Sequence, residues 1–156
     1  MNRLLSASSL YFVLRLVIGG VFVAAGALKL ADPAAFAMAI DGYGLVSWST
    51  AKLLSHALPV LEIVSGLGVI LDVRGALALI AVQLLVFLGV VGWAVHLGLD
   101  VDCGCFGPSA QPGGGSGDLK ETLVRDGALL AGCLVLYWRR WVGTGRPRSL
   151  LHPFRR

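Results

Sequence analysis

The chain has 156 residues, of which 56% are hydrophobic and 14% are charged. Soluble globular domains are about 25% charged, so this composition excludes an ordinary soluble domain and indicates an integral membrane protein. The net charge of +4 comes from arginines that follow the last apolar stretch. Without a folded basic domain, this charge does not indicate nucleic-acid binding.

Four apolar stretches follow one another along the chain, at about residues 10–30, 53–71, 76–99 and 123–142. Each approaches the roughly 20 residues that a helix needs to cross about 30 Å of hydrocarbon, and none alternates as a barrel strand does. The first is too long for the core of a cleaved signal peptide. We therefore expect an all-α fold in which residues 1–156 form one membrane domain, built as a four-helix bundle.

The first loop, residues 31–52, contains a predicted surface helix. Asp32 can cap a helix whose first residue is Pro33, and the segment that follows is apolar with few charges. Asp41 and the glycines after it end this segment. It is expected to lie on the membrane surface, where it can cover one end of the bundle.

Arg15 in the first stretch and Glu62 in the second are charged residues at membrane depth. Such residues are costly if they face lipid, so they usually face the bundle and pair. Arg15 shares a helix face with Gly19 and Gly26, which let a neighbouring helix come close, and a long arginine side chain can reach Glu62. We predict a buried Arg15–Glu62 ion pair, with a proton relay or a contact to a quinone as the functional alternative.

Several polar side chains are expected at one edge of the membrane, near the loop that follows the third stretch. A cation near a thiol favours the reactive thiolate, and a histidine can carry protons. Anchoring at the membrane interface is the simpler alternative. The candidates for this supporting role are Lys29, His56, His96 and Arg125.

The distribution of basic residues predicts the orientation of the chain. Arginine-rich segments mark the cytoplasmic side, and residues 143–156 form a basic tail that can also touch anionic lipid. The two longer loops hold mainly acidic residues. We therefore expect both termini in the cytoplasm and the two longer loops outside. The arginines on which this prediction depends are Arg3, Arg74, Arg139, Arg140, Arg146, Arg148, Arg155 and Arg156.

Cys103 and Cys105, separated by Gly104, are the strongest candidates for chemistry. They fall on the predicted outer side, where disulfides persist. Glycine permits the backbone of so small a disulfide ring. The ring closes almost no chain and therefore stabilises the fold little, which suits redox exchange better than cross-linking. We predict these two cysteines as the catalytic pair, and Cys133, in the fourth stretch, as an inert core residue.

Two other interpretations of the cysteine pair remain open. The thiols can be incidental to a solvent-side turn, or they can hold Cu(I) or Zn(II), which soft thiolates favour. A metal would need further ligands, for which His56 or His96 would serve. Because redox exchange accounts for the pair without further ligands, we predict no metal site.

The chain resembles the MauE/DoxX-like membrane proteins. The resemblance rests on Arg15 and on residues 26–33 (GALKLADP), 42–45 (GYGL), 58–62 (LPVLE) and 100–107 (DVDCGCFG). It implies a four-helix membrane protein associated with thiol redox. MauE is linked to maturation of methylamine dehydrogenase, and DoxX-like relatives to quinone-reducing and oxidase complexes. The plan also looks like that of quinone-linked disulfide-forming proteins, although a second cysteine pair near the membrane is missing here.

We therefore predict a thiol–disulfide redox protein in the cytoplasmic membrane of a bacterium. Cys103 and Cys105 exchange with a thioredoxin-like or disulfide-containing protein outside, and a quinone in the bundle accepts or supplies the electrons. The alternative is a non-catalytic accessory subunit of a larger membrane oxidoreductase complex.

Overall fold

The computed structural model describes residues 2–98 and 116–142, with side chains for residues 11–98 and 119–140. Cys103, Cys105 and the basic tail 143–156 lie outside the described residues. Within these ranges the fold is helical, which confirms the prediction of an all-α protein. The helices are α1 (Asn2–Ala31), α2 (Pro33–Gly42), α3 (Trp48–Ile70), α4 (Ala76–His96) and α5 (Ser116–Val142).

Three helices in the described part of the chain are long and apolar enough to cross a membrane. They are Tyr11–Ala31 of α1, Trp48–Ile70 and Ala76–His96, and they coincide closely with the first three predicted stretches. The fourth stretch lies within α5, which carries charged residues near both ends. Its helical state is as expected, and its membrane crossing stays a prediction.

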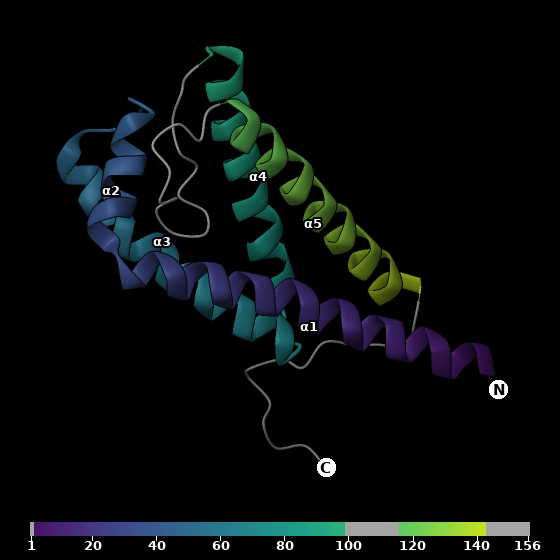
Figure 1. Cartoon of the computed structure of the whole chain (residues 1–156). Helices are drawn as coiled ribbons and strands as arrows, with labels where there is room; N and C mark the ends of the chain where they lie inside the picture. The colour runs from purple at the N-terminus through teal and green to yellow at the C-terminus, as the bar shows by residue number, and fades with distance from the viewer. Residues whose placement is uncertain (1, 99–115, 143–156) are drawn as a thin grey trace.

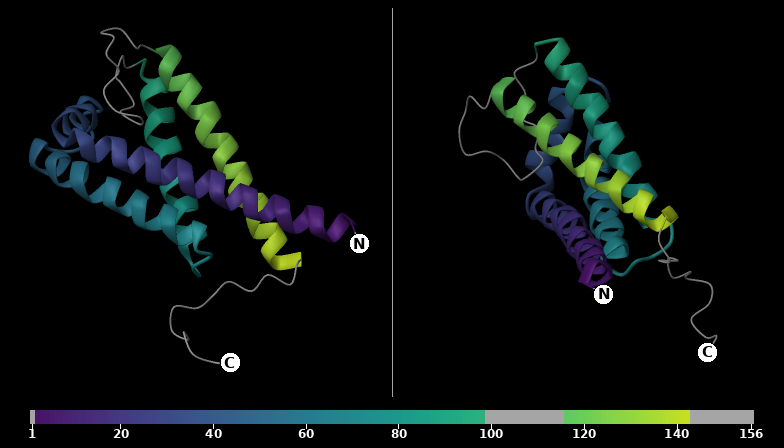
Figure 2. Two further views of the ribbon diagram at one scale, coloured as in Figure 1. Left: turned by 60° about the horizontal axis from the view of Figure 1, so that its bottom comes forward. Right: turned by 90° about the vertical axis from the view of Figure 1, so that its right-hand side faces the viewer.

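The four long helices form two pairs that cross each other (Figures 1 and 2). In one pair, α1 lies along α3, and in the other α4 and α5 meet where α4 ends and α5 begins. Contacts of α3 with α4 and of α1 with α5 join the pairs. Each long helix therefore packs against two other long helices, and α2 packs on α3.

Glycines set the close approach of α1 and α3. A Cβ atom built on Gly26 would lie 2.6 Å from the Pro59 carbonyl oxygen, and one on Gly66 would lie 2.7 Å from the Gly19 carbonyl oxygen. These distances are too short for real atoms, so the two backbones touch only because these positions lack side chains. Gly19 and Gly26 therefore form a close-packing face, as predicted, and the helix that packs against it is α3.

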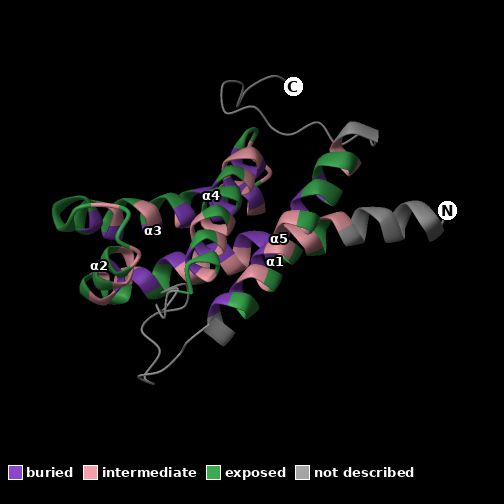
Figure 3. Cartoon of the chain, turned by 90° about the horizontal axis from the view of Figure 1, so that it is seen from above, coloured by how far each residue is buried: buried purple, intermediate pink, exposed green. Residues whose placement is uncertain are grey.

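The buried residues lie where the helices face one another (Figure 3), and the outward faces carry many apolar side chains. One buried cluster joins the four long helices through side chains such as Ile18, Val69, Ile80 and Leu136. Large apolar side chains also point away from the protein, among them Phe12, Val13, Val60, Val64, Val82, Leu85 and Leu134. Exposed apolar faces on this scale are expected of helices that are solvated by lipid rather than by water.

The predicted helix in the first loop is present as α2. The Asp32 carboxylate accepts a hydrogen bond of 2.9 Å from the backbone N–H of Ala35, and Pro33 is the first helical residue. Phe36 and Ala37 are buried, so one face of the helix packs on the protein. The helix carries Phe36 toward the end of α1, which positions the site described next.

Candidate functional site

The predicted Arg15–Glu62 pair is wrong, because the two residues bind different partners. Arg15 lies at the far end of α3, where its Nε donates a 3.0 Å hydrogen bond to the Val69 carbonyl and its Nη2 donates to the Ile70 carbonyl. Its Nη1 lies 3.4 Å from Oδ2 of Asp72. Arg15 therefore caps the carboxyl end of α3, whose last carbonyls have no helical partner.

Asp72 joins three parts of the chain at this end of the molecule, which is the end predicted to face the cytoplasm. It lies in the turn between α3 and α4, with φ of 58°, and accepts a 2.9 Å hydrogen bond from the Tyr11 hydroxyl. Arg140 of α5 contacts the same carboxylate at 2.5 Å and donates to the Tyr11 oxygen at 3.0 Å. We call Tyr11, Arg15, Asp72 and Arg140 the inner cluster, in which both carboxylate oxygens have cationic partners.

Glu62 is instead paired with Lys29, in the half of the molecule where α1 ends. Lys29 Nζ lies 2.5 Å from Glu62 Oε1, and the two residues are only 3% and 1% exposed. The α1–α3 contact through Gly26 brings this pair together. The prediction that Arg15 and Glu62 face the bundle and form ion pairs was correct, but each has another partner. The partner of Glu62 comes from the other end of the first stretch.

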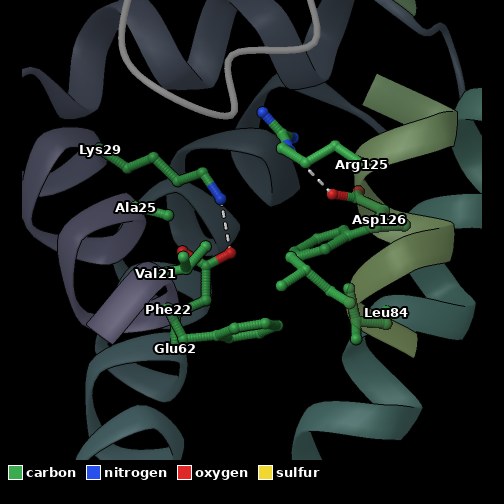
Figure 4. Close-up of a pocket in the computed structure, with 10 residues that line it drawn as sticks. Val21, Phe22, Ala25, Lys29, Glu62, Leu84, Arg125 and Asp126 are labelled. Atoms are coloured by element: carbon green, nitrogen blue, oxygen red, sulfur yellow. Dashed lines mark hydrogen bonds and ion pairs between the residues drawn. The ribbon is translucent and has the colours of Figure 1, made fainter. Parts of the chain in front are cut away.

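A small hollow opens beside this pair, between α1, α3, α4 and α5 (Figure 4). Arg125 and Asp126 of α5 lie across the hollow from Lys29 and Glu62, and Arg125 Nε lies 3.1 Å from Asp126 Oδ1. We call Lys29, Glu62, Arg125 and Asp126 the outer cluster. Two of the four predicted supporting residues, Lys29 and Arg125, therefore meet at one place.

The outer cluster contains an acceptor that has no partner within the described part of the chain. Glu62 Oε2 is buried and receives no hydrogen bond from the described residues. The hollow has a volume of about 30 Å³, which is enough for a water molecule. A buried carboxylate oxygen without a partner is costly, so this oxygen is where a water or a proton would be held.

A second, larger cavity lies on the α2 side of Lys29. Its volume is about 230 Å³ and its lining is almost wholly apolar. The rings of Phe36 and Phe87 form part of its wall, and their centroids lie 5.2 Å and 5.0 Å from Lys29 Nζ. Lys29 and Phe87 line both this apolar cavity and the small hollow, so these two side chains lie between the two spaces.

The two predicted supporting histidines do not join the outer cluster. His56 is exposed on α3, where Nδ1 lies 3.0 Å from the Lys52 carbonyl oxygen and 3.2 Å from Ser55 Oγ. His96 is exposed at the end of α4. Cys133 is buried in the core and free, as predicted.

Three features in and around the two clusters were missed from the sequence. Asp72 could have been found as an acidic residue in a short turn next to Arg74. Nothing in the sequence pattern indicated that Phe36 and Phe87 flank Lys29. The 2.9 Å hydrogen bond from Gln83 to Ser65, which joins α4 to α3, was also not expected.

Comparison with known proteins gives one match. The family model described as Methylamine utilisation protein MauE matches residues 7–139, a range that includes the cysteine pair and every residue of both clusters except Arg140. No curated protein and no solved structure matches the chain. The match covers most of the chain, and three helices have the length and apolar composition of membrane spans. The chain therefore belongs to the MauE family and is a membrane protein.

Proposed function

We propose that this protein is a membrane thiol–disulfide redox protein. Cys103 and Cys105 exchange with a thioredoxin-like or disulfide-containing protein on the outer side, and electrons pass between this pair and a lipid-soluble quinone. Membership of the MauE family suggests an accessory role in a redox-related pathway, here methylamine utilisation. The proposal adds a chemical step to that role.

The observation that carries the proposal is where the cysteine segment is attached. α4 ends at His96 and α5 begins at Ser116, and Val91, Ala94 and Leu119 pack together at this end of the two helices. Both attachment points of residues 99–115 therefore lie at one end of the bundle. The same half of the molecule contains the Lys29–Glu62 pair, so the segment begins and ends in the half that holds these buried polar groups.

The distribution of charge supports the proposed orientation. Arg15 and Arg140 bind Asp72 at the opposite end of the molecule, where the turn between α3 and α4 also carries Arg74. Basic residues favour the cytoplasmic side. This supports an orientation in which the attachment points of the cysteine segment lie outside, in the compartment where disulfides form.

The redox state of the cysteines in intact cells tests the proposal. Free thiols are blocked with one maleimide, disulfides are then reduced, and the released thiols are labelled with a heavier, membrane-impermeant maleimide. We expect Cys103 and Cys105 to take the second label from outside, and a Cys133→Ser control to give the same pattern. Cysteines that are fully reduced in growing cells, or that label only after the membrane is broken, would contradict the proposal.

A further inference from the structure

We propose that the apolar cavity beside Lys29 binds the ring of a lipid-soluble quinone, with one ring carbonyl held by the Lys29 ammonium. This inference rests on the proposed function, which needs a two-electron partner for the dithiol. It goes further by naming the binding site and the groups that recognise the ligand.

The cavity has the size and lining for one substituted ring. Its volume of about 230 Å³ exceeds the roughly 150 Å³ of a cavity that holds benzene and is smaller than a whole lipid. Phe36 from α2, and Phe87 and Val90 from α4, form apolar walls around it. Aromatic walls suit a flat ring, because offset or edge contacts add to the apolar burial.

Lys29 provides the polar recognition. Its side chain is 3% exposed, and Glu62 Oε1 is the one oxygen among the described residues that accepts a hydrogen bond from Lys29 Nζ. An ammonium has three N–H donors, so the remaining donors face the aromatic rings and are available to a ligand oxygen. A buried cation with spare donors at an apolar cavity is a site for an acceptor.

The charge of the pair selects a neutral acceptor over an anion. Glu62 already neutralises Lys29 at 2.5 Å, so a carboxylate or phosphate ligand would bring a second negative charge next to Glu62. A ring carbonyl accepts the same hydrogen bond without that repulsion. The cavity therefore favours a quinone over a fatty acid or a phospholipid headgroup.

The rim of the cavity leaves a path for an apolar tail. Val86 on α4 and Leu45 before α3 line the cavity and are 56% and 51% exposed. Because these side chains lie on the outer surface of a membrane protein, a chain attached to the bound ring can leave between them into lipid.

The redox step balances without a further reactant. Cys103 and Cys105 lose two electrons and two protons as the bond between their sulfurs forms. The quinone takes up two electrons and two protons to become a quinol. Lys29 hydrogen-bonds the carbonyl oxygen. Glu62, which lines the water-sized hollow, relays protons from that hollow to Lys29 as the quinone is reduced. The reverse direction balances in the same way.

A photolabelling experiment on the full-length protein in nanodiscs tests the site. The probe is an azido-benzoquinone with a decyl tail, and labelled peptides are identified by mass spectrometry. We expect saturable labelling on the peptides that contain Phe36 and Phe87, displaced by decyl-benzoquinone and not by decanoic acid. Labelling spread over all helices, or displacement by decanoic acid at the same concentration, would overturn the inference.

Variants on one helix provide the matched control. Val90→Phe fills the cavity and should lower saturable labelling at least tenfold. Val82→Phe makes the same change on an exposed face of α4 outside the cavity and should label as the unmodified protein does. A Lys29→Met/Glu62→Gln variant keeps the site neutral and should weaken binding about tenfold or more. Unchanged labelling in both Val90→Phe and the double variant would refute the site.

The cysteines separate this inference from the proposed function. A Cys103→Ser/Cys105→Ser variant lacks the dithiol and should bind the probe as the unmodified protein does. If the cysteines exchange with a partner but no saturable labelling occurs, the quinone site is wrong and the thiol chemistry stands. If labelling occurs but the cysteines do not exchange, the site stands and the proposed function fails.

Discussion

The inner and outer clusters contain similar residues but differ in how completely their polar atoms are paired. In the inner cluster, Asp72 has partners on both oxygens, and Arg15 also caps the end of α3. In the outer cluster, Glu62 Oε2 has no partner among the described residues, and Glu62 lines a hollow. Complete pairing is what a structural clamp requires. An incomplete set next to two cavities is what a binding or proton-handling site requires.

The two clusters also differ in burial. The charged side chains of the inner cluster keep 11–19% of their surface exposed at the end of the molecule, so the long arginines there can reach the membrane surface. Lys29 and Glu62 are almost completely buried. Changes in the outer cluster should therefore cost more stability than changes in the inner cluster, and only the outer changes should alter ligand binding.

Breaking the Lys29–Glu62 pair should have the largest effect. Glu62→Gln strands a buried ammonium and should lower the free energy of unfolding by roughly 3–5 kcal/mol, while the double variant Lys29→Met/Glu62→Gln should recover much of that loss. Denaturation in detergent measures each value. In the matched cycle, the stability losses of Arg15→Gln and Glu62→Gln should add without coupling. A coupling energy between these two substitutions would show that Arg15 and Glu62 interact after all.

Widening the α1–α3 contact should have a smaller effect that depends on position. Gly26→Ala places a methyl group against the Pro59 carbonyl and should cost about 1–3 kcal/mol, and it should also weaken quinone labelling because it moves Lys29. Gly20→Ala, which meets nothing within 4 Å, is the control and should be neutral or slightly stabilising. Equal thermal stability of the two variants would show that the helices do not touch at Gly26.

Removing the charge of Asp72 should have the smallest effect on stability. Asp72→Asn should cost about 1–2 kcal/mol, less than a buried pair, because the freed arginines can turn toward the membrane surface. The folded fraction should keep normal quinone labelling, as a clamp far from the cavity predicts. If labelling falls as much as in the Lys29→Met/Glu62→Gln variant, the inner cluster affects ligand binding. That result would contradict a purely structural role for it.

The sequence predicted the helices well because membrane spans and caps are local signals. Residues 10–30, 53–71 and 76–99 correspond to α1, α3 and α4, and Asp32 with Pro33 marked the start of α2. These features depend on runs of apolar residues and on neighbours in the chain, which a single sequence contains.

The partner of Glu62 could not be predicted in the same way. α1 and α3 are antiparallel, so Glu62 near the middle of α3 has Arg15 toward one end of the facing helix and Lys29 toward the other. Helical spacing gives the face of each residue but not the relative height of two helices. That offset along the helix axes depends on the contacts of Gly19 and Gly26 with the α3 backbone. The sequence alone does not show which residues of α3 the two glycines contact.

Trapping a mixed disulfide tests the central claim most directly, because exchange needs one sulfur to attack and another to resolve. Asp102 precedes Cys103 in the sequence, and a neighbouring negative charge disfavours a thiolate, so we expect Cys105 to attack and Cys103 to resolve. In cells, Cys103→Ser should then give a reducible higher-mass adduct on a non-reducing gel, and Cys133→Ser should give none. If neither Cys103→Ser nor Cys105→Ser forms an adduct and both keep full activity, the dithiol is not catalytic and the accessory-subunit alternative replaces it.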